Sequence, residues 1–209
     1  MAFTDADKAY QEIKQKIVTI EMRPGAVIRE ADLMQDLRLG RTPIREALKR
    51  LQSENLVIAS PRRGMFVADI AITDLTQIYE MRVELESLCA RLAAQRINVE
   101  QVKKMQCLVE EFRKTDQEDN ERLLALDGHF HVLLAEAANN KFLRDELEHL
   151  HNLSMRIWHL ALTFTRPEDI DVGAHLDILA AIEARDHLLA EKRMRKHIEK
   201  FHQTIRQYL

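Results

Sequence analysis

The segment that most constrains the fold of this chain is residues 40–48, GRTPIREAL. Thr42 can accept a hydrogen bond from the first free backbone N–H groups of a helix, as an N-cap residue does. Pro43 then suits the first helical position, because its missing N–H would have no partner there. Apolar residues follow at i, i+3, i+4 and i+7, namely Ile44, Ala47, Leu48 and Leu51. The segment predicts an amphipathic helix that begins at Pro43 and buries one stripe.

The other face of this helix and the segment before it indicate a DNA-binding structure. Arg45, Lys49 and Gln52 share a face beside the apolar stripe, and a cationic, amide-bearing face suits the major groove. Upstream, residues 30–37 predict a short helix that is joined to the next one by a tight link at residues 38–41. This spacing is typical of a helix-turn-helix.

The next stretch predicts a β-hairpin wing. Two short apolar runs, residues 56–59 and 65–67, flank a turn at residues 61–64. Asn55, just before the first run, can adopt the left-handed conformation that ends a helix. The alternative interpretation is an amphipathic helix whose charged face is merely solvated. Charge favours DNA, because residues 38–63 contain seven Lys/Arg and two Asp/Glu.

Through residues 41–48 and 64–67, the segment 8–68 resembles the winged helix-turn-helix of the GntR superfamily of bacterial regulators. The resemblance implies that two arginines of the helix read bases or phosphates and that a glycine lets the wing tip enter the minor groove. Two positions depart from the family pattern, since Gly40 replaces a common Ser or Thr and Ala31 replaces an Arg of some members. The expected DNA-binding residues are Arg41, Thr42, Arg45, Lys49, Arg62, Arg63 and Gly64.

Length and charge divide the chain into two parts. Its 209 residues, 46% of them hydrophobic, are enough for two small domains with cores of their own. Residues 1–68 contain 12 Lys/Arg and 9 Asp/Glu, so their net charge is positive. The rest of the chain contains 19 Lys/Arg and 25 Asp/Glu, so its net charge is negative. We therefore expect a DNA-binding domain at residues 1–70 and a domain with another task at residues 71–209. With no apolar run that could span a bilayer and no basic-then-apolar leader, the protein is expected to be cytoplasmic, without membrane contact.

Residues 73–208 show helical periodicity and no strand pattern. They predict an antiparallel bundle of six helices, which makes the fold class mainly α. Thr73 is the expected N-cap of the first helix, Asn98 and Gln101 form a capping pair for the second, and residues 185–186 form the last turn. The expected helices are residues 73–95, 98–114, 121–138, 143 to just before Pro167, 172–184 and 187–208.

Four polar residues of the bundle predict a metal site. Asp127 and His131 lie one helical turn apart, and their apolar neighbours turn that face inward. His175 and His197 each lie ten residues from an end of the turn at residues 185–187. In an antiparallel hairpin both then stand about 15 Å from the turn, at ~1.5 Å per residue, and face each other. Three neutral imidazoles and one carboxylate suit a first-row divalent cation, although an accidental cluster is the alternative.

Residues 73–208 also resemble the FCD ligand-binding domain of FadR-type GntR regulators, of the six-helix kind, through the motifs at residues 79–86 and 127–131. The resemblance implies that the Asp and the three His are metal ligands and that Arg82 lies near an effector pocket. A guanidinium close to an ion with open positions favours a planar carboxylate ligand. The alternative is that Arg82 only pairs with Glu86, four residues further on.

Together these patterns predict a DNA-binding transcriptional regulator, expected to be a repressor that binds a pseudo-palindromic operator as a homodimer. Its expected ligands are a small organic acid and a divalent ion such as zinc, nickel or manganese. A helical-bundle metalloenzyme is the rival class, because Glu-x-x-His, a spacing of di-iron sites, occurs three times. The copies that begin at Glu146 and Glu148 point to different faces, and no nucleophile with a base is evident, so no enzyme is expected.

Overall fold

The computed structural model describes residues 3–116, 118–161 and 172–207. The chain divides into two compact units, Met1–Ala71 with Met155–Leu160, and Ile72–Ser154 with Ala161–Leu209. The first unit contains α1 (Asp5–Val18), β1 (Val27–Ile28), α2 (Glu30–Leu37), α3 (Arg41–Ser53), β2 (Val57–Ser60) and β3 (Gly64–Val67).

The helices of the first unit share an apolar core. Thr4 begins α1 with a capping box, in which the Thr4 hydroxyl accepts a hydrogen bond from the Asp7 N–H and the Asp7 carboxylate accepts one from the Thr4 N–H. α1 packs against α3. The apolar stripes of the two helices are fully buried, at Ile13, Ile17, Ile44, Leu48 and Leu51. The stripe expected in α3 is therefore the side of that helix that faces the core.

The start of α3 differs from the prediction. The helix begins at Arg41 with Gly40 as its N-cap, so Thr42 is not the N-cap and Pro43 is not the first helical residue. Pro43 is the third residue of the helix, and it is tolerated there because the first four N–H groups of a helix have no acceptor within it. The preceding link is tight because Arg38 takes a left-handed conformation, with φ of 55°.

The wing is an antiparallel sheet of three strands in the order β1-β3-β2. The predicted hairpin is confirmed, and Val57 pairs with Val67 across it. Asn55 has a φ of 58°, the left-handed conformation predicted after α3. The sequence does not predict β1, since two residues are too few to show the period of a strand.

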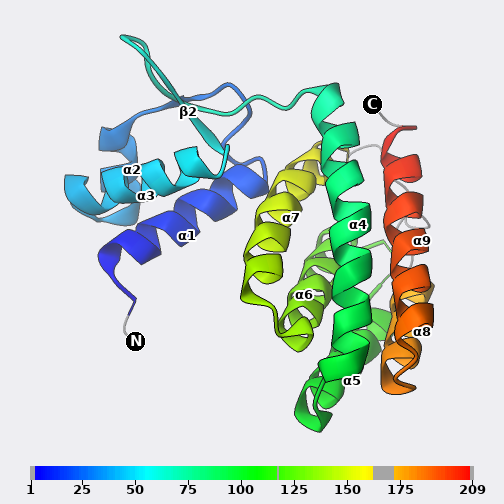
Figure 1. Ribbon diagram of the computed structural model, residues 1–209. Coiled ribbons are helices and arrows are strands. Elements are labelled where there is room, and N and C mark those ends of the chain that lie inside the picture. The colour runs from blue at the N-terminus through cyan, green and yellow to red at the C-terminus, as the bar shows by residue number, and fades with distance from the viewer. Residues whose placement is uncertain (1–2, 117, 162–171, 208–209) are drawn as a thin grey trace. The chain divides into compact units, whose positions relative to one another are not determined.

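The second unit is an all-helical bundle, as predicted, and no strand occurs among its described residues (Figure 1). α4 and α9 run side by side, and α8 and α9 form an antiparallel hairpin (Figure 1). The helices are α4 (Ile72–Arg96), α5 (Val99–Lys114), α6 (Asn120–Ala138), α7 (Lys141–Ala161), α8 (Val172–Glu183) and α9 (His187–Ile205), and Met155–Leu160 of α7 belong to the first unit.

Several ends of these helices follow signals in the local sequence. Asn98 and Gln101 form the predicted capping box of α5. Asn139 ends α6 in a left-handed conformation, with φ of 46°. Asp186 caps α9 by accepting a hydrogen bond from a backbone N–H of the first turn. These caps set the lengths of the helices and hence the heights at which their side chains enter the core.

Other ends differ from the prediction or cannot be compared with it. Thr73 is not an N-cap, because α4 already includes Ile72, and uncapped helix ends commonly shift by one or two residues. The predicted end of α7 near Pro167 and the predicted last residue of α9, Tyr208, lie outside the described residues. Within the described part of the chain, each helix is too short or too polar to cross a membrane.

Candidate metal centre and DNA-binding surface

The predicted DNA-binding residues of α3 are exposed. Arg41, Thr42, Arg45 and Lys49 all reach solvent, on the side of the helix away from its buried stripe. Glu30 of α2 organises the two arginines. Its carboxylate oxygens lie 3.0 and 2.9 Å from Nε of Arg45, and one of them lies 4.0 Å from Nε of Arg41. Two guanidinium groups of α3 are therefore drawn to one point of its exposed face.

A further arginine of α3 has a different, structural role. Nη1 of Arg50 donates to the Asp7 carboxylate at 2.9 Å, and its guanidinium lies 3.8 Å from the centre of the Tyr10 ring. Both partners belong to α1. Arg50 thus joins α3 to α1, with its side chain 49% exposed, whereas Arg41 and Arg45 are drawn toward Glu30 of α2.

The tip of the wing carries the other predicted DNA contacts. Arg62, Arg63 and Gly64 are exposed there. Arg62 and Gly64 have φ values of 65° and 100°, in the left-handed region that favours glycine. No atom lies within 4 Å of the place where a Cβ on Gly64 would stand. The turn therefore needs glycine at residue 64 for its backbone conformation and not for lack of space.

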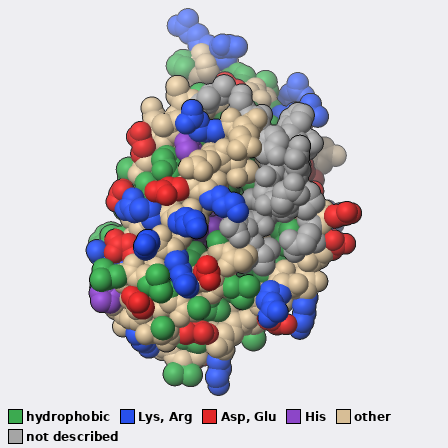
Figure 2. Space-filling view, turned by 90° about the vertical axis from the view of Figure 1, so that its right-hand side faces the viewer, with side chains coloured by type: hydrophobic (Ala, Val, Ile, Leu, Met, Phe, Trp, Pro, Cys, Tyr) green, Lys and Arg blue, Asp and Glu red, His purple; other side chains and the backbone are tan. Residues whose placement is uncertain are grey.

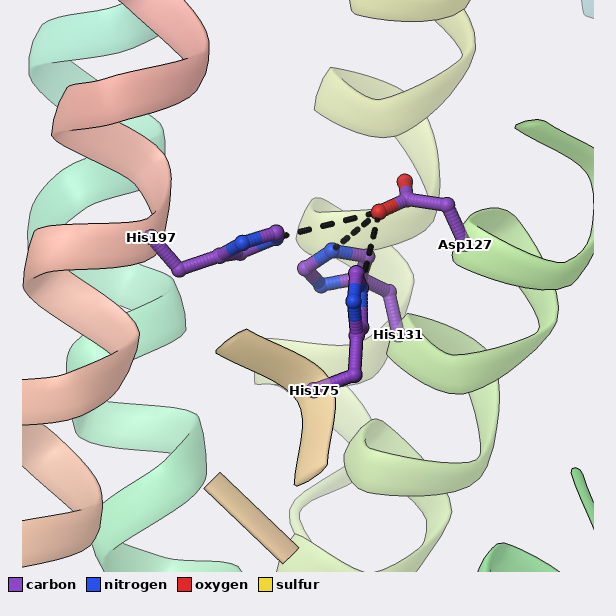
Figure 3. A group of neighbouring side chains, drawn as sticks. All are labelled: Asp127, His131, His175 and His197. Atoms are coloured by element: carbon purple, nitrogen blue, oxygen red, sulfur yellow. Dashed lines mark hydrogen bonds and ion pairs between the residues drawn. The ribbon is translucent and has the colours of Figure 1, made fainter. Parts of the chain in front are cut away.

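In the bundle, the structure brings together the four predicted metal ligands (Figure 3). Asp127 and His131 project from α6, His175 from the beginning of α8 and His197 from α9 (Figure 3). One ligand atom from each residue lies within 4.8 Å of the others. All four residues are buried, and His175 is entirely inaccessible to solvent.

The three imidazoles surround one oxygen atom, Oδ1 of Asp127 (Figure 3). Nε2 lies 3.0 Å from it in His175, 3.7 Å in His197 and 3.8 Å in His131. Nitrogen ligands about 2.1 Å from a common ion stand roughly 3.4 Å apart in a tetrahedron. Among the residues that the structure describes, none makes a hydrogen bond with the buried Nε2 of His131. Both observations fit a divalent metal ion held by these four side chains.

The charges of this group move the pKa values of its histidines in opposite directions. Burial and the neighbouring His175 lower the pKa of His197 to about 3. Burial also opposes a charge on His131, but Glu86 and Asp127 outweigh burial and raise the pKa of His131 to about 9. Burial would raise the pKa of Asp127, yet His131 and His175 hold it well below its usual range. At neutral pH His131 is therefore charged and His197 is not.

Two charged residues of α4 lie beside the predicted ligands. Glu86 is only 3% exposed, and its Oε2 contacts Nδ1 of His131. The other oxygen of Glu86 accepts a hydrogen bond from Nε of Arg82 at 2.6 Å, and Nη1 of Arg82 donates to the Ser154 hydroxyl at 2.7 Å. The ion pair considered as the alternative role of Arg82 is thus present. Sequence reasoning missed Glu86 as part of the site, and its only signal was the spacing from Arg82.

His151 of α7 also borders the group. Its ring centre lies 6.0 Å from that of His131, and burial together with Arg82 lowers the pKa of His151 to about 4. Its Nε2 lies 3.0 Å from the place of a Cβ on Gly128, so with a side chain at that position the ring would have to shift by a few tenths of an ångström. Sequence reasoning did not include His151 among the residues of the site. The available signal was Gly128, because glycine inside a helix costs about 1 kcal/mol relative to alanine.

The outer surface of the bundle is different from this interior. Over α8 and α9, Lys/Arg and Asp/Glu side chains are interspersed (Figure 2). Several of them form exposed pairs, such as the two hydrogen bonds of 2.8 Å between Arg195 and Glu84. Such exposed pairs stabilise a protein by about 0–1 kcal/mol. The mixed charge of this face contrasts with the exposed cationic side chains of α3 and the wing.

Comparison with known families and proteins accounts for both units. The model described as bacterial regulatory proteins, gntR family, matches residues 5–67, and that of the FCD domain matches residues 77–200. The chain is 26% identical to the HTH-type transcriptional repressor RspR of Escherichia coli strain K12, over 95% of this chain and 87% of RspR. It is 28% identical to the Nta operon transcriptional regulator of Aminobacter aminovorans, over 90% and 88% of the two chains.

Among solved structures, Escherichia coli McbR/YncC has the same fold. Its TM-score is 0.89 with 99% of each chain covered, at 22% sequence identity. The two family matches follow the order of the two units along the chain, with the helix-turn-helix first. The chain therefore belongs to the GntR family of bacterial regulators and carries an FCD domain, so it is a DNA-binding transcriptional regulator and not an enzyme.

Proposed function

We propose that this regulator is a repressor whose operator affinity is set by a divalent metal ion and a small carboxylate, both bound in residues 71–209. The buried group of Asp127, His131, His175 and His197 carries the proposal. Buried charges need partners, and a cation would neutralise the carboxylate that the imidazoles surround. Relatedness to RspR, which is named a transcriptional repressor, supports the direction of regulation.

The ion would be zinc, nickel or manganese, held by the four side chains of this group. Imidazole nitrogen suits zinc and nickel, and carboxylate oxygen suits manganese. Zinc is satisfied by four protein ligands, whereas an ion that prefers six ligands keeps two positions for water or an anion. When bound, the ion supplies the positive charge and the open positions that attract a carboxylate.

The carboxylate effector would bind between this ion and Arg82. A guanidinium group presents two parallel N–H donors that match the two oxygens of a carboxylate. Arg82 is buried next to the predicted ligands, where its charge is little screened by solvent. The effector would have to share Arg82 with Glu86 and Ser154, its present hydrogen-bond partners.

The domain of residues 1–70 would bind double-stranded DNA through α3 and the wing. α3 would enter the major groove and the wing tip the adjacent minor groove. Two copies in a homodimer would occupy the half-sites of a pseudo-palindromic operator, because the symmetry of such a site mirrors that of the protein. The proposed contacts are Arg41, Thr42, Arg45 and Lys49 of α3, with Arg62, Arg63 and Gly64 of the wing.

The test is DNA binding by one protein preparation in three states. The operator is first selected from random DNA. Its affinity is then measured for protein stripped by a chelator, loaded with metal, and loaded with metal plus a panel of hydroxy and dicarboxylic acids. We expect the states to differ by roughly 5- to 150-fold, the usual range of coupling between two sites. Asp127→Asn should remove the response, and Glu84→Gln on the exposed face of α4 should keep it. The proposal would be contradicted if a protein that is shown to bind metal had the same operator affinity when stripped, when loaded with metal and when loaded with metal plus an acid.

A further inference from the structure

One carboxylate of α4 joins the predicted effector-binding arginine to a predicted metal ligand. Oε1 of Glu86 accepts a hydrogen bond from Nε of Arg82 at 2.6 Å, while Oε2 of Glu86 contacts Nδ1 of His131. Arg82 and Glu86 are 4% and 3% exposed, so water screens neither charge appreciably. The two oxygens of a single side chain thus face the two binding groups from opposite sides.

We propose that Glu86 positions His131 for metal binding and couples the metal to the anion that binds Arg82. The inference rests on the proposed function, in which both ligands occupy this domain. Glu86 is not itself a metal ligand, since it contacts the far nitrogen of the imidazole ring. It acts through His131.

The positioning follows from the chemistry of the imidazole ring. When Nδ1–H donates to a carboxylate, the lone pair stays on Nε2 and the ring is held in one orientation. Here Nε2 of His131 lies on the side of Asp127, 3.8 Å from its Oδ1, and 5.5 Å separates the ring centres of His131 and His197. The nitrogen that faces the other ligands is therefore the one that Glu86 leaves free. A carboxylate on the other nitrogen also makes the ligand more basic.

The coupling follows from the sharing of one negative charge. Arg82 and His131 both interact with the Glu86 carboxylate. An anion on Arg82 would neutralise part of the guanidinium charge. The interaction between Arg82 and Glu86 would then weaken, and the interaction between Glu86 and His131 would strengthen. His131 would then bind a cation more tightly, and by reciprocity the cation would strengthen binding of the anion. Charge alone thus gives positive coupling, in addition to any direct contact between the anion and the ion.

The rival explanation is that Glu86 is only the counter-ion of Arg82. A double-mutant cycle separates the two roles. The metal dissociation constant is measured by chelator competition for the wild type, Glu86→Gln, Arg82→Gln and the double variant, at pH 9.5, where His131 is neutral and protons do not compete with the metal. Glutamine keeps the shape of the Glu86 side chain but removes its charge. In place of Arg82 it is shorter and also uncharged, and each variant retains a polar group in the core. The matched control is Glu84→Gln, two residues away on the exposed side of α4, where Glu84 pairs with Arg195.

We expect Glu86→Gln to weaken binding of zinc or nickel by about 10- to 100-fold, the usual effect of removing a carboxylate behind a histidine ligand. The loss should persist in the Arg82→Gln background, and Glu84→Gln should bind metal like the wild type. The absorption spectrum of the cobalt-loaded protein should also change in Glu86→Gln, because it reports how His131 is oriented. Circular dichroism of the metal-free variants checks that each is folded.

Three results would overturn the proposal. If Glu86→Gln weakens metal binding only when Arg82 is present, Glu86 is merely the counter-ion of that arginine. If the wild type binds metal and Glu86→Gln binds it equally well, Glu86 does not position His131, while the proposed function stands. If the wild type itself binds no metal, both this inference and the proposed function are wrong.

Discussion

The two functional regions of this protein are built in opposite ways. The side chains of Arg41 and Arg45 are 66% and 58% exposed and are held by little more than Glu30. In the bundle, by contrast, Glu86 and His175 are almost or entirely buried, and each contacts other polar groups of the site. A change on the first surface should therefore alter DNA binding with little effect on folding. A change in the second should alter ligand binding and stability together, because buried polar groups depend on one another.

The largest expected effect is in the bundle, for His197→Ala. A ligand at a thousand times its dissociation constant stabilises the folded state by about 4 kcal/mol, and this variant should lose most of that gain. Chemical unfolding with and without zinc, nickel or manganese measures the difference. His187→Ala, a histidine variant at the start of the same helix, should keep the gain. Equal stabilisation of both variants by metal would place the ion elsewhere.

The next effect is on the DNA-binding surface. Arg45→Ala should cost roughly 1–3 kcal/mol of specific binding if the side chain makes a bidentate contact with a base. Arg50→Ala is the matched control in the same helix, because Arg50 faces α1 and should leave DNA affinity nearly unchanged. Binding to selected and to random DNA is compared. An equal loss on both DNAs would show that Arg45 contacts phosphate.

The effect of a single pH unit on metal binding should be somewhat smaller. A metal ligand must be neutral, but the pKa of His131 is raised to about 9 in the metal-free site. Below that pH a proton has to leave His131, so metal affinity should rise about tenfold, or 1.4 kcal/mol, per pH unit up to pH 9. His197, whose pKa is about 3, is already neutral and adds nothing over this range. Chelator competition from pH 6.5 to 9 measures the slope, and a flat profile would contradict the assignment of His131.

The smallest effect is expected at the wing. Arg62→Ala and Arg63→Ala should each lower the slope of log affinity against log salt by roughly 0.9, the value for one phosphate contact. Specific and random DNA should be affected alike, unlike in Arg45→Ala. A salt series on both DNAs is the measurement. If either variant changes the base preference instead, the wing arginines contact bases as well as phosphates. They would then not differ from Arg45 in the way predicted here.

The sequence predicted those parts of the fold that local patterns determine. The stripe of α3, the hairpin, the cap at Asn98, the turn at residues 185–186 and the all-helical second unit all follow from residues close together in the chain. The errors have the same origin. Pro43 is compatible with several positions of the first helical turn, so it does not define where α3 begins. β1 exists only because β3 pairs with it.

The candidate site was predictable where spacing alone brings residues together. Asp127 and His131 share a helix face, and the turn at residues 185–187 sets His175 and His197 at one height. Glu86 and His151 were missed because their positions depend on how α4 and α7 pack against α6, which no local pattern reveals. The difference between the two regions thus extends to prediction, since the DNA-binding surface is made from one short segment and the metal site from three helices and their neighbours.

Elemental analysis of gently purified protein tests the central claim most directly. The wild type should contain about one divalent ion per chain, because the four side chains converge on one point. Asp127→Asn and His197→Ala should contain almost none, whereas Glu84→Gln should match the wild type. A wild-type protein that is free of metal, and that gains no stability from added zinc, nickel or manganese, would contradict the account.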